Sequence, residues 1–248
     1  MSTWLVDVGN SRCKVAPTRD GELGAVSVVA HDDSTALIAD LATAGSPPDR
    51  VFLASVAPSA VTERLLAAFG AQPTLALTRV ASGDCFPSIV SGYRKPEQLG
   101  VDRLLAMVAA RAERQGPLCV VDAGTAVTVD FVDQDGMHQG GFILPGLAMS
   151  RRCLLENTAI PRDDDVERGA TLGRDTATGV ALGALNAIVG LVERFTVGRA
   201  ALFRGEETAV VVGGGDADVL ADLLPMPCIK LDHLVLRGLA AYAASKGA

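Results

Sequence analysis

Two short segments, one in each half of the chain, share a pattern that strongly restricts the fold. Each is an apolar run ending in Asp, a small or apolar residue, a Gly and a residue with a hydroxyl or amide: Asp7-Val8-Gly9-Asn10-Ser11 and Asp122-Ala123-Gly124-Thr125. A glycine at a bend between two strands leaves backbone N–H groups exposed, and these can bind phosphate oxygens. An Asp beside them can hold a cation. We therefore interpret the two turns as a pair of phosphate-binding elements that together could hold ATP.

The predicted order of elements also repeats, which indicates an α/β fold with a duplicated domain. Gly116-Pro117 is the expected boundary, so we expect domains at 1–115 and 116–248. Alternating and continuous apolar runs predict strands at 3–8, 12–16, 23–30, 50–56, 73–77, 118–122, 126–132, 137–144, 208–212 and 227–231. Helical spacing predicts helices from 37 and at 58–69, 101–115, 147–156, 176–195, 216–224 and 233–245.

Composition excludes several classes of function. The apolar fraction of 49% supports two cores, and the net charge of −7 argues against a general nucleic-acid binder, although a local basic pocket remains possible. The five cysteines have no metal-ligand spacing, so we expect reduced thiols rather than a zinc site or disulfides; they are Cys13, Cys85, Cys119, Cys153 and Cys228. Without a leader or an uninterrupted run of about 18 apolar residues, we expect a cytoplasmic protein with no membrane partner.

Two further motifs could carry chemistry, and each has a structural alternative. Gly213-Gly214-Gly215-Asp216 lies between an apolar strand and a helix, where a flat ligand or an anion could approach the backbone. The alternative is a glycine-rich connection between the strand and the helix. Asp102, near the start of the helix predicted from 101, could accept a proton from a hydroxyl, and Arg103 could pair with a carboxylate. The alternative is a helix cap with a solvated Arg.

Other features are less informative. The three histidines, His31, His138 and His233, have no metal-ligand spacing and are expected to be satisfied or solvated. The run 162–165 reads as a solvated loop. The segment 140–146 begins with two glycines and ends in Pro-Gly, which suits close packing or approach of a ligand to the backbone.

Taken together and in this order, the motifs resemble those of type III pantothenate kinases over nearly the whole chain. The residues that carry the resemblance are Asp7, Gly9, Asn10, Ser11, Lys14, Tyr93, Pro96, Gly100, Asp102, Arg103, Asp122, Gly124, Thr125, Thr128, Asp130, Gly140, Gly141, Ile143, Pro145, Gly146, Gly213, Gly214, Gly215 and Asp216. The resemblance implies two duplicated ribonuclease-H-like domains of the actin-like ATPase fold with a central cleft. It also implies transfer of phosphate from ATP to pantothenate, the first step of coenzyme A biosynthesis, by a homodimer.

The resemblance also implies roles for individual residues. The expected nucleotide-binding residues are Asp7, Val8, Gly9, Asn10, Ser11, Arg12, Cys13, Lys14 and Thr125. The expected pantothenate-binding residues are Tyr93, Gly100, Val101, Asp102, Arg103 and Thr176. Asp102 is the expected proton acceptor, Asp7 is expected to help place Mg²⁺, and Asp122 is expected to bind a monovalent cation, K⁺ or NH₄⁺.

Three parts of the sequence depart from the family's usual pattern, and two alternative functions stay open. Ser11 stands where Thr is common, Val212 replaces a Thr before the glycine run, and Arg151-Arg152 makes its stretch unusually basic. The alternatives are another small-molecule kinase or a phosphohydrolase on the same fold, and a non-catalytic ATP-binding regulatory factor. The presence of Asp102 and Asp122 favours the enzyme.

Overall fold

The structure is a computed structural model that describes residues 2–19, 21–34, 36, 48–70, 75–84, 86, 88–163, 165–167, 169–197, 202–203 and 206–247. The chain forms two compact units. Unit 1 comprises Met1–Gln115, Gly136–His138 and His233–Ala248, and unit 2 comprises Gly116–Asp135 and Gln139–Asp232. The first break between the two units falls between residues 115 and 116. The end of the chain and the segment 136–138 differ from the expected division, because both belong to unit 1.

Unit 1 is a mixed sheet with helices on both faces. Its strands are β1 (Thr3–Val8), β2 (Arg12–Arg19), β3 (Glu22–Leu23), β4 (Ser27–Ala30), β5 (Arg50–Ser55) and β6 (Ala76–Val80). The order is β3-β2-β1-β5-β6, and β4 also pairs with β2. The central strand β1 runs antiparallel to β2 and parallel to β5. Its residues Trp4, Val6 and Val8 pack with Leu65 and Phe69 of α2 (Ser59–Gly70).

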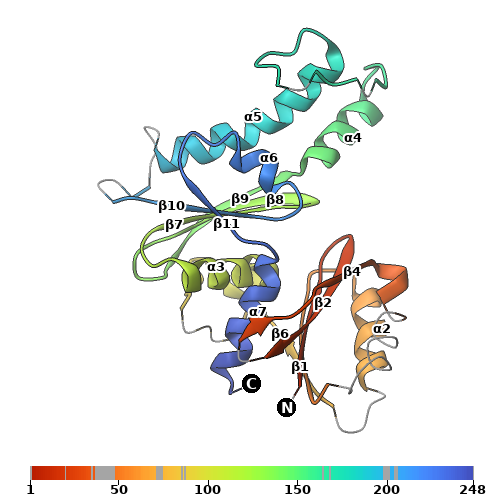
Figure 1. Cartoon of the computed structure of the whole chain (residues 1–248), viewed down its shortest axis with the longest axis vertical. Helices are drawn as coiled ribbons and strands as arrows, with labels where there is room; N and C mark the ends of the chain where they lie inside the picture. The colour runs from red at the N-terminus through yellow and green to blue at the C-terminus, as the bar shows by residue number, and fades with distance from the viewer. Residues whose placement is uncertain are drawn as a thin grey trace. The chain divides into compact units, whose positions relative to one another are not determined.

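The opposite face of this sheet contacts α7 (Leu234–Ser245) and α3 (Val101–Glu113), as Figure 1 shows for α7. These two helices pack very closely, because a side chain at Gly238 would overlap the carbonyl oxygen of Leu105. Almost every α3 residue is buried, whereas the sequence predicted one apolar face. The terminal helix was expected in the second domain; its extensive contact with α3 places it in unit 1. Two short 3₁₀ helices, η1 (His31–Asp33) and η2 (Pro96–Gln98), complete the unit.

Unit 2 repeats the sheet topology of unit 1. Its strands are β7 (Leu118–Ala123), β8 (Ala126–Val132), β9 (His138–Pro145), β10 (Ala209–Gly213) and β11 (Cys228–Lys230), in the order β11-β10-β7-β8-β9. Strand β7 corresponds to β1, because it is central, antiparallel to β8 and parallel to β10. The duplication predicted from the sequence is therefore confirmed at the level of strand order.

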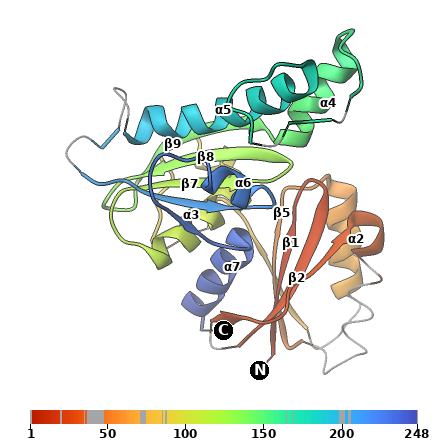
Figure 2. The same ribbon diagram turned by 45° about the horizontal axis from the view of Figure 1, so that its top comes forward.

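The helices of unit 2 are α4 (Leu147–Asn157), α5 (Thr176–Thr196) and α6 (Ala217–Ala221). Ile188 and Val192 of α5 and Leu220 of α6 share one apolar core with the β7, β8 and β10 side chains. Helix α4 lies beside α5 in both ribbon views, most clearly in Figure 2. The sheet therefore has α5 and α6 on one face.

Three sequence predictions need correction or fall outside the described residues. The strand predicted at 23–30 is divided into β3 and β4. Gly24 N–H donates to Pro17 O at 2.8 Å, but proline has no backbone N–H, so Pro17 cannot donate the second hydrogen bond that would continue the strand pair. The strand predicted at 73–77 begins at Ala76 and continues to Val80, where parallel pairing with β5 ends; residues 71–74 lie outside the described residues. The helix predicted from 37 lies outside the described residues.

Candidate functional site

The first predicted phosphate turn, in unit 1, is a tight hairpin between β1 and β2. Asp7 and Lys14 are directly opposite each other in this pair, and Lys14 Nζ lies 3.6 Å from Asp7 Oδ2. Asp7 is only 5% exposed, so the nearby ammonium group offsets the cost of burying its charge. The pair places a carboxylate and a lysine at the base of the turn, as expected from the sequence.

The side chains of this hairpin divide into two groups. Those of Asn10, Ser11 and Arg12 are exposed and can face a ligand. Those of Val8 and Cys13 are fully buried, so only their backbone groups are available. Burial, and to a lesser extent the charge of Asp7, raises the pKa of Cys13 to about 12. The Cys13 thiol is therefore a neutral core group.

The hairpin is closed by hydrogen bonds that the sequence pattern did not reveal. Gly9 N–H donates to Arg12 O at 3.0 Å, and in the second turn Gly124 N–H donates to Ala126 O at 3.0 Å. The two glycine N–H groups are thus used inside the hairpins, and phosphate donors must come from neighbouring residues. His31 Nε2 lies 2.9 Å from Gly9 O and must be the donor, because a carbonyl oxygen only accepts.

The second predicted turn, in unit 2, connects β7 and β8. Asp122 is half-buried at the end of β7, where it pairs with Gly213 of β10 on one side and Thr128 of β8 on the other. Thr125 is exposed at the turn itself. The strand register therefore brings the first residue of the glycine run beside the predicted cation ligand.

Two glycines from distant segments pack directly on this turn. A side chain at Gly146 would overlap Gly124 O, and one at Gly214 would overlap Ala123 O. Hydrogen bonds join the same segments: Gly146 N–H donates to Thr125 O at 3.0 Å, and Asp216 N–H donates to Ala123 O at 3.1 Å. Three motifs that were separate in the sequence thus form one backbone-lined site in unit 2. Such a surface suits a flat or anionic ligand.

This packing makes Gly214→Ala a sharp test of the second turn. Gly214 has a φ of +94°, so alanine there would be strained and would also overlap the turn. We expect a loss of about 3 kcal/mol in the free energy of unfolding, measured by urea denaturation. Gly215→Ala is the matched control, because its Cβ would meet no atom within 4 Å. We expect it to change stability by less than about 0.5 kcal/mol, and equal losses in both variants would contradict the described packing.

Three of the residues predicted to bind pantothenate lie together in unit 1, near the start of α3: Asp102, Arg103 and Tyr93. Asp102 Oδ1 accepts a hydrogen bond from Arg103 N–H at 2.8 Å, so the carboxylate folds over the positive end of the helix. Gly100, the residue before the helix, allows this fold, because a side chain there would overlap the Asp102 carboxylate. Asp102 remains partly exposed and can reach a ligand.

Arg103 is 5% exposed rather than solvated. Its Nη1 donates to Tyr93 Oη at 2.7 Å, and its guanidinium carbon lies 5.6 Å from the centre of the Tyr93 ring. A buried guanidinium held in this way can present a planar donor pair to a carboxylate. The apolar side chain of Val101 is buried.

Thr176, the last predicted substrate residue, begins α5 in unit 2 and is exposed. The preceding residue, Asp175, caps the helix by accepting Thr178 N–H at 2.7 Å and Thr178 Oγ1 at 2.8 Å. The first of these hydrogen bonds is the main reason that the Asp175 carboxyl has a lowered pKa. Thr176 also lines a cavity of about 580 Å³ between α4 and α5, with Pro145, Ser150, Cys153 and Val180 among its neighbours.

The structure adds two histidines that sequence reasoning did not select. His31 contacts the first turn through Gly9 O, and His138 stacks on Tyr93. Neither is near its partner in the sequence, so no local pattern could have identified it. Within the described part of the chain, no three His, Cys, Asp or Glu side chains gather as a metal-ligand cluster.

Comparison with known proteins agrees with this arrangement of motifs. The family model described as type III pantothenate kinase matches residues 4–197. The type III pantothenate kinase of Thiobacillus denitrificans is 38% identical over 250 residues, which cover 98% of this chain and 97% of that protein. That of Stenotrophomonas maltophilia K279a is 35% identical over 254 residues, covering all of both chains.

Solved structures show the same fold at lower identity. A Campylobacter jejuni protein assigned to the Baf family of transcriptional activators has a TM-score of 0.65 at 22% identity, covering 99% of this chain and all of that one. An inorganic polyphosphate/ATP-glucomannokinase from Arthrobacter has a TM-score of 0.52 at 15% identity, covering 100% and 99%. These neighbours and the two equivalent sheets confirm the predicted actin-like ATPase fold with duplicated ribonuclease-H-like domains. By its sequence match, the chain belongs to the type III pantothenate kinase family.

Proposed function

We propose that this chain transfers the γ-phosphoryl group of ATP to the primary hydroxyl of pantothenate. The product is 4′-phosphopantothenate, and the reaction opens coenzyme A biosynthesis. Family membership over residues 4–197 carries this proposal. The site agrees with it, because a partly exposed Asp and a buried Arg stand side by side at the start of α3. We keep the predicted boundary between residues 115 and 116 as the division between the two ribonuclease-H-like halves, with the terminal helix α7 returning to the first half.

Each turn, taken by itself, offers groups that fit part of a magnesium–nucleotide complex. In unit 1, the hairpin offers Asn10, Ser11 and Lys14 to phosphate, and Asp7 to Mg²⁺. In unit 2, the backbone surface around Gly214 and the Thr125 hydroxyl fit a nucleotide. When bound, Mg²⁺ neutralises charge on the phosphates. Lys14, on the strand that leaves the same hairpin, can provide the same kind of help from the protein, because its ammonium group is positively charged and only partly buried.

The acceptor is held by unit 1 residues in this proposal. Arg103 binds the pantothenate carboxylate, Tyr93 orients Arg103, and Asp102 accepts the proton of the hydroxyl that is phosphorylated. Because phosphoryl transfer has a loose transition state, positioning and charge neutralisation provide most of the rate enhancement. A phosphohydrolase would need no carboxylate-binding arginine, so the buried, hydrogen-bonded Arg103 favours the kinase.

We also place a monovalent cation at Asp122 in unit 2. The register of β7 pairs Asp122 with Gly213 of β10 and Thr128 of β8, so its carboxylate is on the same face of the sheet as the Thr128 hydroxyl. Oxygens of both kinds can bind K⁺ or accept hydrogen bonds from NH₄⁺. We expect turnover to be higher in KCl or NH₄Cl than in NaCl at the same ionic strength. Asp122→Asn should reduce this difference, and turnover independent of the cation in the wild type would remove the cation from the proposal.

We also propose that the protein is a cytoplasmic homodimer that pairs through α5. Among the described residues, α5 alone is long and apolar enough to cross a membrane. An 18-residue stretch of this helix has a mean hydropathy of 1.5, and only 28% of that stretch is buried. Its inner face packs on the unit 2 sheet. Its exposed face has a stripe of small residues, of which the first three also line the cavity beside α4: Thr176, Gly179, Gly183, Ala187 and Gly190. An apolar face with small residues suits close approach of a second helix, and a twofold dimer would place two copies of α5 together.

Gly190→Glu tests this pairing. A Cβ at Gly190 would meet no atom within 4 Å, so the fold should tolerate the change while a charge enters the proposed interface. We expect sedimentation to show a dimer for the wild type and a monomer for Gly190→Glu. The matched control is Gly70→Glu, at an equally open helical glycine in unit 1. A monomeric wild type, or a Gly190→Glu variant that stays dimeric, would reject the interface.

The proposed activity is tested by following ADP release with and without pantothenate in KCl. We expect ADP release that depends on pantothenate and saturates with its concentration. ATP binding without pantothenate-dependent turnover would instead favour the regulatory alternative.

A further inference from the structure

A buried histidine contacts the aromatic side of the proposed acceptor site. His138 is fully buried, and its ring is stacked on Tyr93 with 5.6 Å between ring centres and 23° between planes. Tyr93 in turn accepts a hydrogen bond from Arg103 Nη1 at 2.7 Å. The three side chains form a continuous chain of contacts from the protein interior to the arginine that we assign to the substrate carboxylate.

The backbone around His138 is built to reach this place. Val90 N–H donates to Gly136 O at 2.9 Å, and His138 N–H donates to Val90 O at 2.9 Å, so segment 136–138 is docked on the segment before Tyr93. Gly136 has a φ of +85°, and a side chain there would overlap Ser88 O. This close approach requires glycine and fixes where the His138 ring lies.

We propose that His138 is a positioning residue that holds the Tyr93 ring and, through it, orients the Arg103 guanidinium toward the acceptor carboxylate. This inference rests on the proposed function, because it takes Arg103 to bind that carboxylate.

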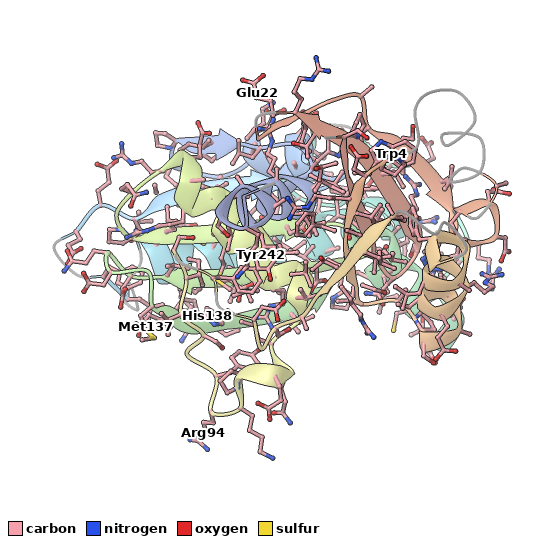
Figure 3. The ribbon with its side chains drawn as sticks, turned by 90° about the horizontal axis from the view of Figure 1, so that it is seen from below. Trp4, Glu22, Arg94, Met137, His138 and Tyr242 are labelled. Carbon is pink, nitrogen blue, oxygen red and sulfur yellow. The ribbon has the colours of Figure 1, made fainter. Side chains whose placement is uncertain are left out.

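The geometry explains why such support is needed. A guanidinium binds a carboxylate well only when its plane is oriented, and Arg has many rotamers. Tyr93 is only half-buried. In Figure 3 the next residue, Arg94, lies at the outer end of this segment, whereas His138 lies closer to the body of the protein. The His138 ring therefore gives the exposed segment a fixed surface on the inner side. An offset-stacked aromatic pair contributes enough to hold such a ring in one orientation.

The test compares His138→Ala with His138→Phe, which keeps a flat ring but has no ring nitrogens. For His138→Ala we expect the KM for pantothenate to rise roughly threefold to tenfold, the loss expected for one aromatic pair. We expect kcat and the KM for ATP to change less than about twofold. His138→Phe should restore most of the pantothenate KM. Because alanine in a buried site can unfold the protein, His138→Leu, which keeps the volume without the flat ring, is measured in parallel and should behave like His138→Ala.

A substrate without the carboxylate distinguishes orientation of Arg103 from general damage. With pantothenol, in which CH₂OH replaces the carboxylate, we expect the variants to have the same KM as the wild type. Equal increases in KM for pantothenate and pantothenol, or for pantothenate and ATP, would overturn the proposal, as would an unchanged pantothenate KM in His138→Ala or His138→Leu. A wild type without pantothenate-dependent turnover would instead reject the proposed function, so the two failures are distinguishable.

Discussion

Replacing Asp102 with Asn is expected to lower kcat by about 10²- to 10⁴-fold, the usual contribution of a positioned general base. Asn has the same shape and can still accept the Arg103 N–H through its amide oxygen, so the start of α3 should stay intact. It cannot take a proton from the pantothenate hydroxyl. Steady-state kinetics at saturating ATP and pantothenate, together with thermal unfolding, measure both effects.

The matched control for this variant is Glu97→Gln, which removes an exposed carboxylate in the 3₁₀ helix just before α3. It makes the same chemical change a short distance away and should leave kcat unchanged. Near-normal turnover of Asp102→Asn would mean that another group, or water, accepts the proton.

The second large effect is expected for Arg103→Lys. Lysine keeps the positive charge but has neither the planar donor pair nor the contact geometry with Tyr93. Because charge-assisted hydrogen bonds to the carboxylate are lost, we expect the KM for pantothenate to rise about tenfold to a hundredfold. The KM for ATP should be nearly unchanged, because the predicted nucleotide residues lie elsewhere.

Arg114→Lys at the C-terminal end of the same helix is the control, because Arg114 is exposed. Pantothenol gives a second check, since Arg103→Lys should have little effect on a substrate without the carboxylate. A variant that binds pantothenate normally would exclude Arg103 as the carboxylate ligand. The proposed role of His138 would then be excluded with it.

Much of the fold could be predicted because it depends on local pattern and on repetition. The two Asp-x-Gly hairpins end the central strands β1 and β7, which occupy equivalent places in equivalent sheets. Asp7 and Lys14 were expected at this turn, and the hairpin register also pairs them directly, which the sequence reasoning had not foreseen. The placement of Asp102 and Arg103 could be predicted for a similar reason, because they are adjacent in the first turn of a helix.

The remaining features depend on contacts between segments that are distant in the sequence. The backbones of Gly146 and Gly214 approach the second turn so closely that a side chain would not fit, and no local pattern of glycines specifies this contact. The terminal helix α7 joins unit 1 because Gly238 lets it approach α3, although it follows the second sheet in the chain. His138 is the clearest case, because its spacing to other histidines is uninformative while its tertiary contact with Tyr93 is specific.

The most direct test of the central claim is to follow a radiolabelled γ-phosphate from ATP in the presence of pantothenate, Mg²⁺ and K⁺. The proposed function predicts that the label appears in 4′-phosphopantothenate, identified by chromatography and mass spectrometry, in amounts equal to the ADP formed. Label that appears only as inorganic phosphate, with pantothenate unchanged, would contradict it and identify a phosphohydrolase.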